Sequence, residues 1–233
     1  VGYAVTRRLV QTEGAIVVAV ARRRVFRVEA LAKQVGEDRL VPITADMAAP
    51  GQAEALVKQV MDRWGRVDAF VHGVNRALRL SALDVSDTEF DLTMQVNVKS
   101  ALYGVQAVSP QMRRQERGAV VIYNPTPVRT EEFAASEAVY SAAAHALSAL
   151  TAGWERQLEA HGVPVREVAP APDEELQPVA RQLQHDLLVV DALRTAFLAP
   201  APSTARLSIT SPLNADPSPT VLFSRGGLAL TQY

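Results

Sequence analysis

Residues 138–147, AVYSAAAHAL, place one phenol in an otherwise small and mostly apolar helical stretch. A tyrosine hydroxyl can pass a proton to a substrate, but its ordinary pKa of about 10 leaves it poorly poised at neutral pH. Because residues four apart share one helix face, Tyr140 is followed on its own face by Ala144, which carries no charge. A tyrosine in such a helix is also typical of core or interface packing, with one partner for its hydroxyl.

The composition limits the classes of function that the chain can have. Its 233 residues are 48% hydrophobic, enough for one large core, and the net charge of -1 gives no general attraction to nucleic acid or an anionic membrane. There is no cysteine, and no cluster of His, Asp and Glu has metal-ligand spacing. The apolar runs are shorter than the roughly 18 residues of a membrane span. We therefore expect a cytoplasmic protein that binds no metal, nucleic acid or membrane.

Short, β-branched apolar runs alternate with helical patterns through most of the chain. The runs expected to form strands are residues 15–20, 40–45, 67–73, 119–124 and 163–169. Apolar residues recur at helical spacing in residues 3–12, 25–36, 51–65, 87–115 and 137–161. Ser86 and Glu89 have the spacing of a capping box at the start of the fourth helix. This alternation predicts an α/β fold, a doubly wound parallel sheet with helices on both faces (three-layer α/β/α).

The last quarter of the chain has a different pattern. Eight of the fourteen prolines fall between Pro170 and Pro219, and much of residues 170–220 has no sustained period. We expect a helix at about 179–198 and a strand at 220–225, joined by extended chain. This proline-rich segment is either a loop-rich closing segment, which would include the substrate loop, or an arm that contacts a partner.

Five pieces of the sequence, in the right order, resemble the short-chain dehydrogenase/reductase family. They are residues 1–23 (ending GAIVVAVARR), 43–57 (ITADMAAPGQAEALV), 64–73 (WGRVDAFVHG), 94–112 (MQVNVKSALYGVQAVSPQM) and 138–172, which begins with the tyrosine helix. The resemblance covers nearly the whole chain. It implies a Rossmann-like single domain over residues 1–233 and the activity of an oxidoreductase.

The resemblance also implies four catalytic groups, and this sequence keeps two. In the family, a tyrosine protonates the carbonyl oxygen as hydride arrives, and a lysine one turn later favours its phenolate. A serine orients the substrate, and an asparagine holds a relay water. Tyr140 and Asn97 match the tyrosine and the asparagine. Ala144 stands at the lysine position and Pro125 at the serine position, with Thr126 beside it as the nearest hydroxyl.

The cofactor positions implied by the resemblance are only partly kept. The positions that remain are Gly2, Arg22, Arg23, Asp46, Gly73 and Pro170. The arginine pair at the end of the second strand favours a 2′-phosphate, which makes NADP the implied cofactor. The same pair is equally typical of a solvated helix start.

The family's first strand lies in the middle of its sheet, and the sequence resembles the family only from the turn after that strand. A missing central strand would leave buried backbone groups unpaired, at about 1–3 kcal/mol each. A domain with about 5–15 kcal/mol of net stability could not tolerate that loss. We therefore expect the polypeptide to have residues upstream of Val1.

Three hypotheses follow. In the first, the chain is a catalytically impaired subunit that acts as a scaffold or partner, as Ala144 and Pro125 indicate. In the second, it is a working NADP-dependent carbonyl reductase with atypical acid/base support, for which the candidate cations are Lys99, Arg76, Arg129 and His145. In the third, it senses NADP(H) without turnover. The resemblance further implies a homo- or hetero-oligomer formed through the helices 87–115 and 137–161.

Overall fold

The computed structural model of the chain describes residues 2–11, 13–23, 26–124, 135–169, 189–193 and 228–232. Its strands are β1 (Ile16–Ala21), β2 (Leu40–Thr44), β3 (Ala69–His72), β4 (Ala119–Tyr123), β5 (Val165–Val168) and β6 (Leu228–Gln232). Its α-helices are α1 (Gly2–Gln11), α2 (Phe26–Val35), α3 (Gln52–Trp64), α4 (Asp87–Met94), α5 (Ser100–Gln115) and α6 (Ala138–Leu158). A π-helical turn, Gln95–Lys99, joins α4 to α5, 3₁₀ turns flank α6 at Ala135–Glu137 and Glu159–His161, and residues 189–193 are helical.

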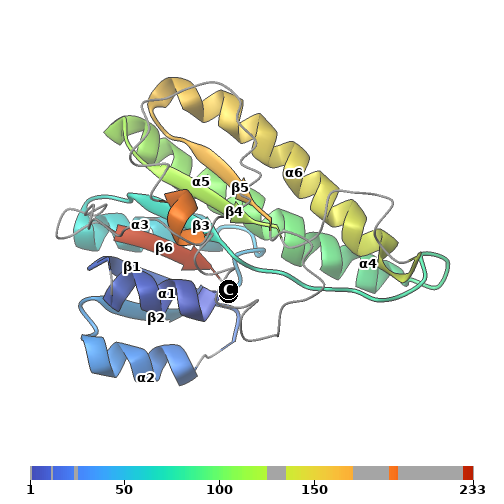
Figure 1. The fold of residues 1–233 in the computed structure, drawn as a ribbon, viewed down its shortest axis with the longest axis horizontal. Helices are drawn as coiled ribbons and strands as arrows, with labels where there is room; N and C mark the ends of the chain where they lie inside the picture. Colours follow the sequence, from blue (N-terminus) through green and yellow to red (C-terminus); the bar gives the residue numbers. More distant parts are fainter. Residues whose placement is uncertain are drawn as a thin grey trace, which may run out of the picture.

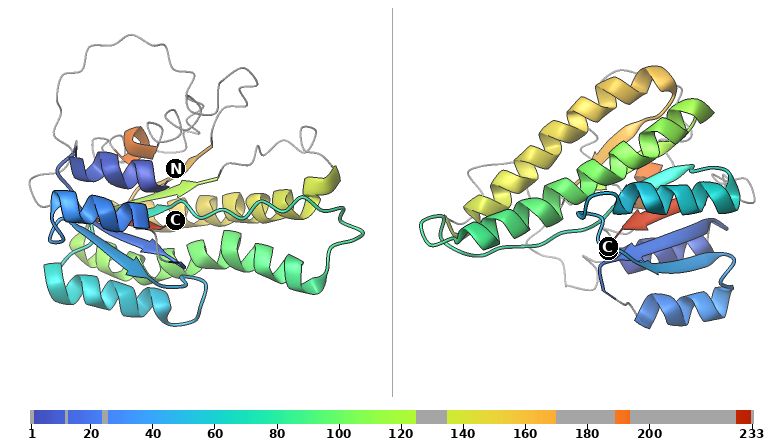
Figure 2. Two further views of the ribbon diagram at one scale, coloured as in Figure 1. Left: turned by 90° about the horizontal axis from the view of Figure 1, so that it is seen from below. Right: turned by 180° about the vertical axis from the view of Figure 1, so that it is seen from behind.

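The six strands form one parallel sheet in the order β2-β1-β6-β3-β4-β5 (Figure 1). One face of the sheet packs against α1, α2 and residues 189–193, and the other face packs against α3, α5 and α6 (Figure 2). Alternate residues of a strand point to opposite faces, so Val17 joins the first core and Val18 the second. The prediction of a three-layer α/β/α fold is confirmed.

The five strands predicted from apolar runs are present as β1 to β5, each within two residues of the expected ends. The helix expected over 87–115 is interrupted by the π-helical turn, which adds a residue to one turn of the helix. The strand expected at 220–225 lies outside the described residues, as does most of the helix expected at 179–198. No helix in the described part of the chain is long and apolar enough to cross a membrane.

β6 was not predicted from the sequence. It fills the central position, hydrogen-bonded to β1 on one side and to β3 on the other. We expected a strand from upstream residues in this position, and residues 228–232 hold it instead. That the polypeptide extends upstream of Val1 stays a prediction.

Ser86 is the N-cap of α4, which gives half of the predicted capping box. The backbone N–H of Glu89 donates to Ser86 Oγ at 3.3 Å, and the Ser86 hydroxyl donates to the Glu89 carboxylate at 3.2 Å. The first bond satisfies one of the free N–H groups at the start of α4, and the second joins the two side chains.

Gly104 of α5 packs directly on the ring of Phe70, which is buried in the centre of β3. A Cβ at position 104 would overlap that ring. We expect Gly104→Ala to lower the free energy of unfolding by about 1–2 kcal/mol, because the overpacked core must shift. Urea denaturation checks this, with Gly153→Ala as the control, since a Cβ at Gly153 meets nothing within 4 Å. An unchanged midpoint for Gly104→Ala would contradict the packing described here.

Candidate active site at the carboxyl edge of the sheet

Tyr140 lies in the first turn of α6, partly buried, beside the segment that follows β3. Its hydroxyl donates a hydrogen bond of 2.9 Å to Oδ1 of Asn75. Asn75 comes three residues after the end of β3, so the contact lies at the carboxyl edge of the sheet. The phenol proton is therefore directed at a side-chain amide of the same chain.

Asn97 lies in the π-helical turn and is 3% exposed. Its Oδ1 accepts a hydrogen bond of 2.6 Å from the backbone N–H of Arg76, and its Nδ2 donates one of 3.0 Å to the backbone carbonyl of Arg76. Asn75 and Arg76 are consecutive residues, so one short segment contacts both predicted catalytic side chains. The structure thus brings Tyr140 and Asn97 to the same short segment, and their catalytic roles stay a prediction.

Of the residues considered as replacements for the missing lysine, those that the structure describes make no hydrogen bond to the phenol. Arg129 lies outside the described residues. The guanidinium of Arg76 donates to Thr93 Oγ1 at 2.9 Å, which directs it to α4. Lys99 is exposed, whereas its neighbour Asn97 is buried. His145 Nδ1 lies 2.7 Å from the backbone carbonyl of Ser141. Within the described residues, no cationic side chain hydrogen-bonds to the Tyr140 hydroxyl.

Ala144, one helical turn after Tyr140, is buried by its neighbours. Ala144 is 4% exposed, and its carbonyl accepts a hydrogen bond of 3.0 Å from Nδ2 of the buried Asn124. Asn124 Nδ2 also lies 2.9 Å from Glu167 Oε1, to which the Ser148 hydroxyl donates at 2.6 Å. This polar cluster joins the ends of β4 and β5 to α6.

The sequence analysis did not single out Asn124, Ser148 or Glu167. The one available signal was an asparagine directly after the apolar run 119–123, where the chain leaves the sheet. Ser148 and Glu167 lie close to Asn124 because α6 and β5 pack beside the end of β4. The spacing of residues in the sequence does not predict this packing.

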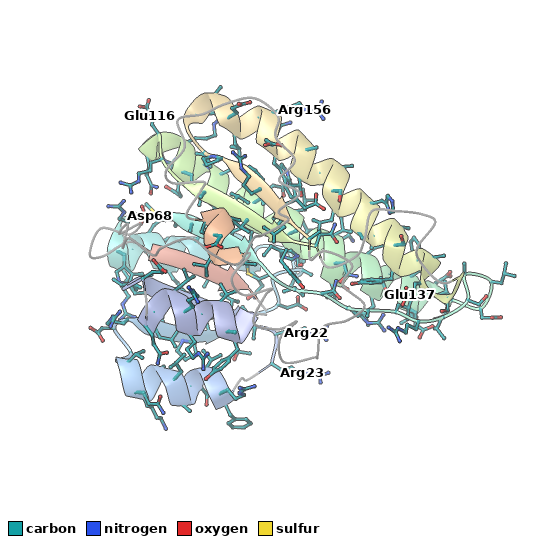
Figure 3. All side chains as sticks on the ribbon, viewed as in Figure 1. Arg22, Arg23, Asp68, Glu116, Glu137 and Arg156 are labelled. Atoms are coloured by element: carbon teal, nitrogen blue, oxygen red, sulfur yellow. The ribbon has the colours of Figure 1, made fainter. Side chains whose placement is uncertain are left out.

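The structure describes five of the predicted cofactor residues. Four of them follow the carboxyl ends of strands, and the fifth begins α1. Arg22 and Arg23 follow β1 and are exposed, and neither has a hydrogen bond or ion pair with the described residues (Figure 3). Asp46 follows β2, and its Oδ1 accepts a hydrogen bond of 3.0 Å from a backbone N–H two residues later. Gly73 directly follows β3, and Gly2 begins α1. Thr126 and Pro170 lie outside the described residues, as does Pro125.

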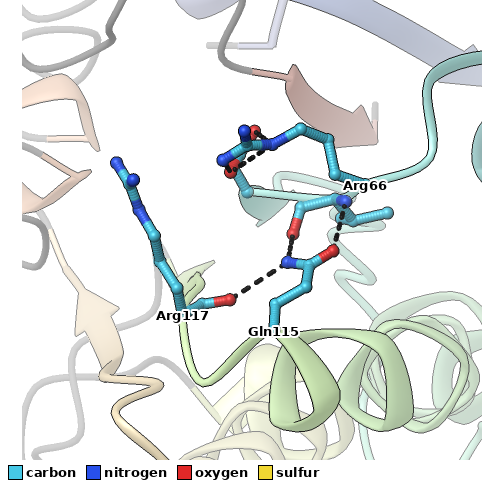
Figure 4. A network of polar contacts seen from close by, with 5 residues as sticks. Arg66, Gln115 and Arg117 are labelled. Carbon is cyan, nitrogen blue, oxygen red and sulfur yellow. Dashed lines mark hydrogen bonds and ion pairs between the residues drawn. The ribbon is translucent and has the colours of Figure 1, made fainter.

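A second polar network lies at the opposite, amino-terminal edge of β3 and β4 (Figure 4). Arg66 pairs with Asp68, whose carboxylate is 2% exposed, and Arg66 Nε lies 3.0 Å from both carboxylate oxygens. The Gln115 side chain bonds the backbone N–H and carbonyl of Val67, at 3.0 and 2.7 Å, and the carbonyl of Arg117 at 3.1 Å. This network fixes the turn into β3 on the side of the sheet away from Tyr140.

No group of three or more His, Asp or Glu side chains in the described ranges is arranged to hold a metal ion. The chemistry that the described site offers is therefore that of a phenol, two amides and a nearby arginine pair. These groups suit proton transfer and the binding of an anionic ligand.

Comparison with known proteins identifies the family of the chain. The model of the short chain dehydrogenase family matches residues 1–178. An uncharacterized oxidoreductase of Staphylococcus epidermidis is 29% identical over 170 residues, which cover 73% of this chain and 72% of that protein. Another from Staphylococcus haemolyticus is 30% identical over 169 residues, covering 72% and 71%.

Solved structures share the same architecture. A metagenomic short-chain oxidoreductase in complex with NADP superposes with a TM-score of 0.69 at 21% identity, covering 81% of this chain and 84% of that one. Serine dehydrogenase from Escherichia coli superposes with a TM-score of 0.65 at 24% identity, covering 73% and 78%. The parallel sheet with helices on both faces defines the fold as Rossmann-like. The chain belongs to the short-chain dehydrogenase family of oxidoreductases.

Proposed function

We propose that this chain is a catalytically impaired subunit of the short-chain dehydrogenase fold, acting as a scaffold or partner in an oligomer. The observation that supports the proposal is the surroundings of Tyr140. Its hydroxyl is bonded to Asn75, and the residue one turn later is a buried alanine. Among the residues that the structure describes, no cation bonds this phenol, and such a phenol is a weak acid/base group at neutral pH, so we expect hydride transfer to a carbonyl to be slow.

The experiment that tests impairment compares NADPH oxidation by the wild-type chain with that of Ala144→Lys, against a panel of aldehydes and ketones. The proposal expects a rate close to background for the wild type and a clear gain for the lysine variant. Rapid turnover by the wild type would favour the working reductase with atypical acid/base support instead.

A second candidate function is the binding of NADP(H) without turnover, and the arginine pair favours it. Arg22 and Arg23 are exposed beside the carboxyl end of β1, with Asp46 after the neighbouring strand β2. Arginine is the residue best suited to hold a phosphate, because its planar fork donates two parallel hydrogen bonds. A solved structure with this fold contains NADP, which is consistent with such a site.

We expect NADPH at 100 times its dissociation constant to stabilise the folded chain by about 2.7 kcal/mol. For a chain of this size that corresponds to a rise in melting temperature of about 5–10 °C. The double variant Arg22→Glu/Arg23→Glu should lose this shift. Arg113→Glu/Arg156→Glu, which reverses two exposed charges at the far ends of α5 and α6, should keep it. No shift for the wild type would eliminate nucleotide binding.

The proposed oligomer would form through the helices 87–115 and 137–161. The outward side of α6 supports this, because Ala142, Ala149 and Ala152 are all exposed there and small residues let helices approach closely. We expect light scattering to give at least twice the chain mass of 25.2 kDa, and Ala149→Glu to lower it. A wild-type mass of 25.2 kDa at high concentration would contradict self-association.

A further inference from the structure

The carboxyl ends of α5 and α6 lie side by side (Figure 1, Figure 2). Between the end of α5 and the 3₁₀ turn that follows α6 is a hollow of about 330 Å³, lined by Pro110, Arg113, Arg114 and His161. β4 begins at Ala119, four residues after α5 ends, so the hollow lies at the amino-terminal edge of the sheet. It is therefore at the edge opposite the one that carries Tyr140.

The nitrogen-bearing side chains around this hollow have no partners among the residues that the structure describes. Arg113 and Arg114 are exposed and His161 is partly buried, and none of the three makes a side-chain hydrogen bond or an ion pair there. Other arginines of the chain behave differently, since Arg66 and Arg166 are each paired with a carboxylate. The hollow thus gathers donors from two separate segments without supplying an acceptor for them.

Basic side chains at the end of a helix commonly interact with its last carbonyls, and this role has to be considered first. At the end of α5, the backbone N–H groups of residues 116–117 donate to the carbonyls of residues 112–113, both at 3.2 Å. After α6, the N–H of Val163 donates to the carbonyl of Leu158, also at 3.2 Å. Backbone groups therefore cap both helices, and the side chains at the hollow are not needed for it.

The chemistry of these side chains selects an anion with several oxygens. Each guanidinium presents a planar fork of N–H donors that matches two oxygens of a phosphate, and an imidazole can add a further N–H. Within the described residues, no carboxylate lines the hollow to compete for these donors. Its volume lies at the low end of the range for small-molecule sites, about 300–1,000 Å³, which suits a small phosphorylated molecule rather than a dinucleotide.

We propose that this hollow is a second ligand site of the chain, which binds a small phosphorylated molecule through Arg113, Arg114 and His161. The guanidiniums donate to the phosphate oxygens from the last turn of α5, and the imidazole donates from the turn after α6. The bound molecule thereby joins the ends of the two helices. The site is separate from the arginine pair that follows β1, which lies at the other edge of the sheet.

Calorimetric titration of the full chain with sodium pyrophosphate tests the proposal. The titration uses the Arg22→Glu/Arg23→Glu chain, so that the arginine pair after β1 cannot hold the probe. We expect saturable binding of one pyrophosphate per chain, and we expect Arg113→Gln/Arg114→Gln to weaken it at least about 10-fold, because charge-assisted hydrogen bonds are lost. No saturable binding up to about 10 mM pyrophosphate would overturn the proposal.

Two further variants separate a built site from general attraction to positive charge. Arg7→Gln/Lys33→Gln removes the same charge from exposed positions on α1 and α2 and should change the affinity less than about twofold. His161→Ala should weaken binding by about 3-fold or more, because the hollow loses its donor from the second segment. Equal weakening by the control pair, or unchanged affinity in a folded His161→Ala chain, would overturn the proposal. None of these titrations contains a nicotinamide nucleotide, so their outcome is independent of the proposed function.

Discussion

Replacing Ala144 by lysine is expected to raise the rate of NADPH-dependent carbonyl reduction by about 100-fold or more over the wild type. The lysine stands one turn after Tyr140 on the same helix face, where its ammonium favours the phenolate and makes the phenol a better proton donor near neutral pH. Ala144 is buried, but the flexible stem of a lysine can carry its charge along the helix to the open edge. The decrease in NADPH absorbance in the presence of ketones and aldehydes measures the gain.

Two controls isolate the charge as the cause. Ala144→Met has a similar length without a charge and should give no gain. The double variant Ala144→Lys/Tyr140→Phe lacks the phenol and should return to the wild-type rate. An Ala144→Lys chain that folds and binds NADPH but shows no gain would contradict the account, because the missing cation would then not explain the impairment.

Removing the side chain of Arg66 is expected to lower the free energy of unfolding by about 3 kcal/mol. Asp68 is 2% exposed, and its carboxylate loses its arginine partner in Arg66→Ala. We place the effect at the low end for a buried pair because Arg66 is itself 43% exposed. The melting temperature should fall by about 6–12 °C, as measured by calorimetry.

The control is an exposed ion pair on one face of α3. Lys58 and Asp62 are 75% and 64% exposed and lie four residues apart on α3, so Lys58→Ala should cost about 0.5 kcal/mol or less. A similar loss for both variants would mean that burial of Asp68 does not govern the effect.

The sequence predicted the strands that have the strongest local signal. The runs at β1 and β4 are almost wholly apolar, rich in valine and bounded by turn residues. β6, with the sequence LALTQ, has a single β-branched residue and follows a richer run at 220–225, which we took as the last strand. The need for a central strand could be argued from buried backbone groups, but its source could not, because parallel pairing is non-local.

The candidate site was predictable in part for a similar reason. Tyr140 and Asn97 could be proposed because the residues around them resemble the corresponding helices of the family. The contact between Tyr140 and Asn75 spans 65 residues and depends on the path of the chain after β3. The side-chain amide of Asn97 bonds the backbone of Arg76, which the residue type alone does not reveal, and its role in holding a relay water stays a prediction.

The most direct test of the central claim is the rate at which the wild-type chain, saturated with NADPH, reduces a panel of ketones and aldehydes. Working enzymes typically turn over at about 1 per second or faster. A site whose phenol is bonded to Asn75 and lacks a cation one turn away should stay below about 0.01 per second for every substrate, at least 100-fold slower. Turnover of about 1 per second with any of them would contradict the account.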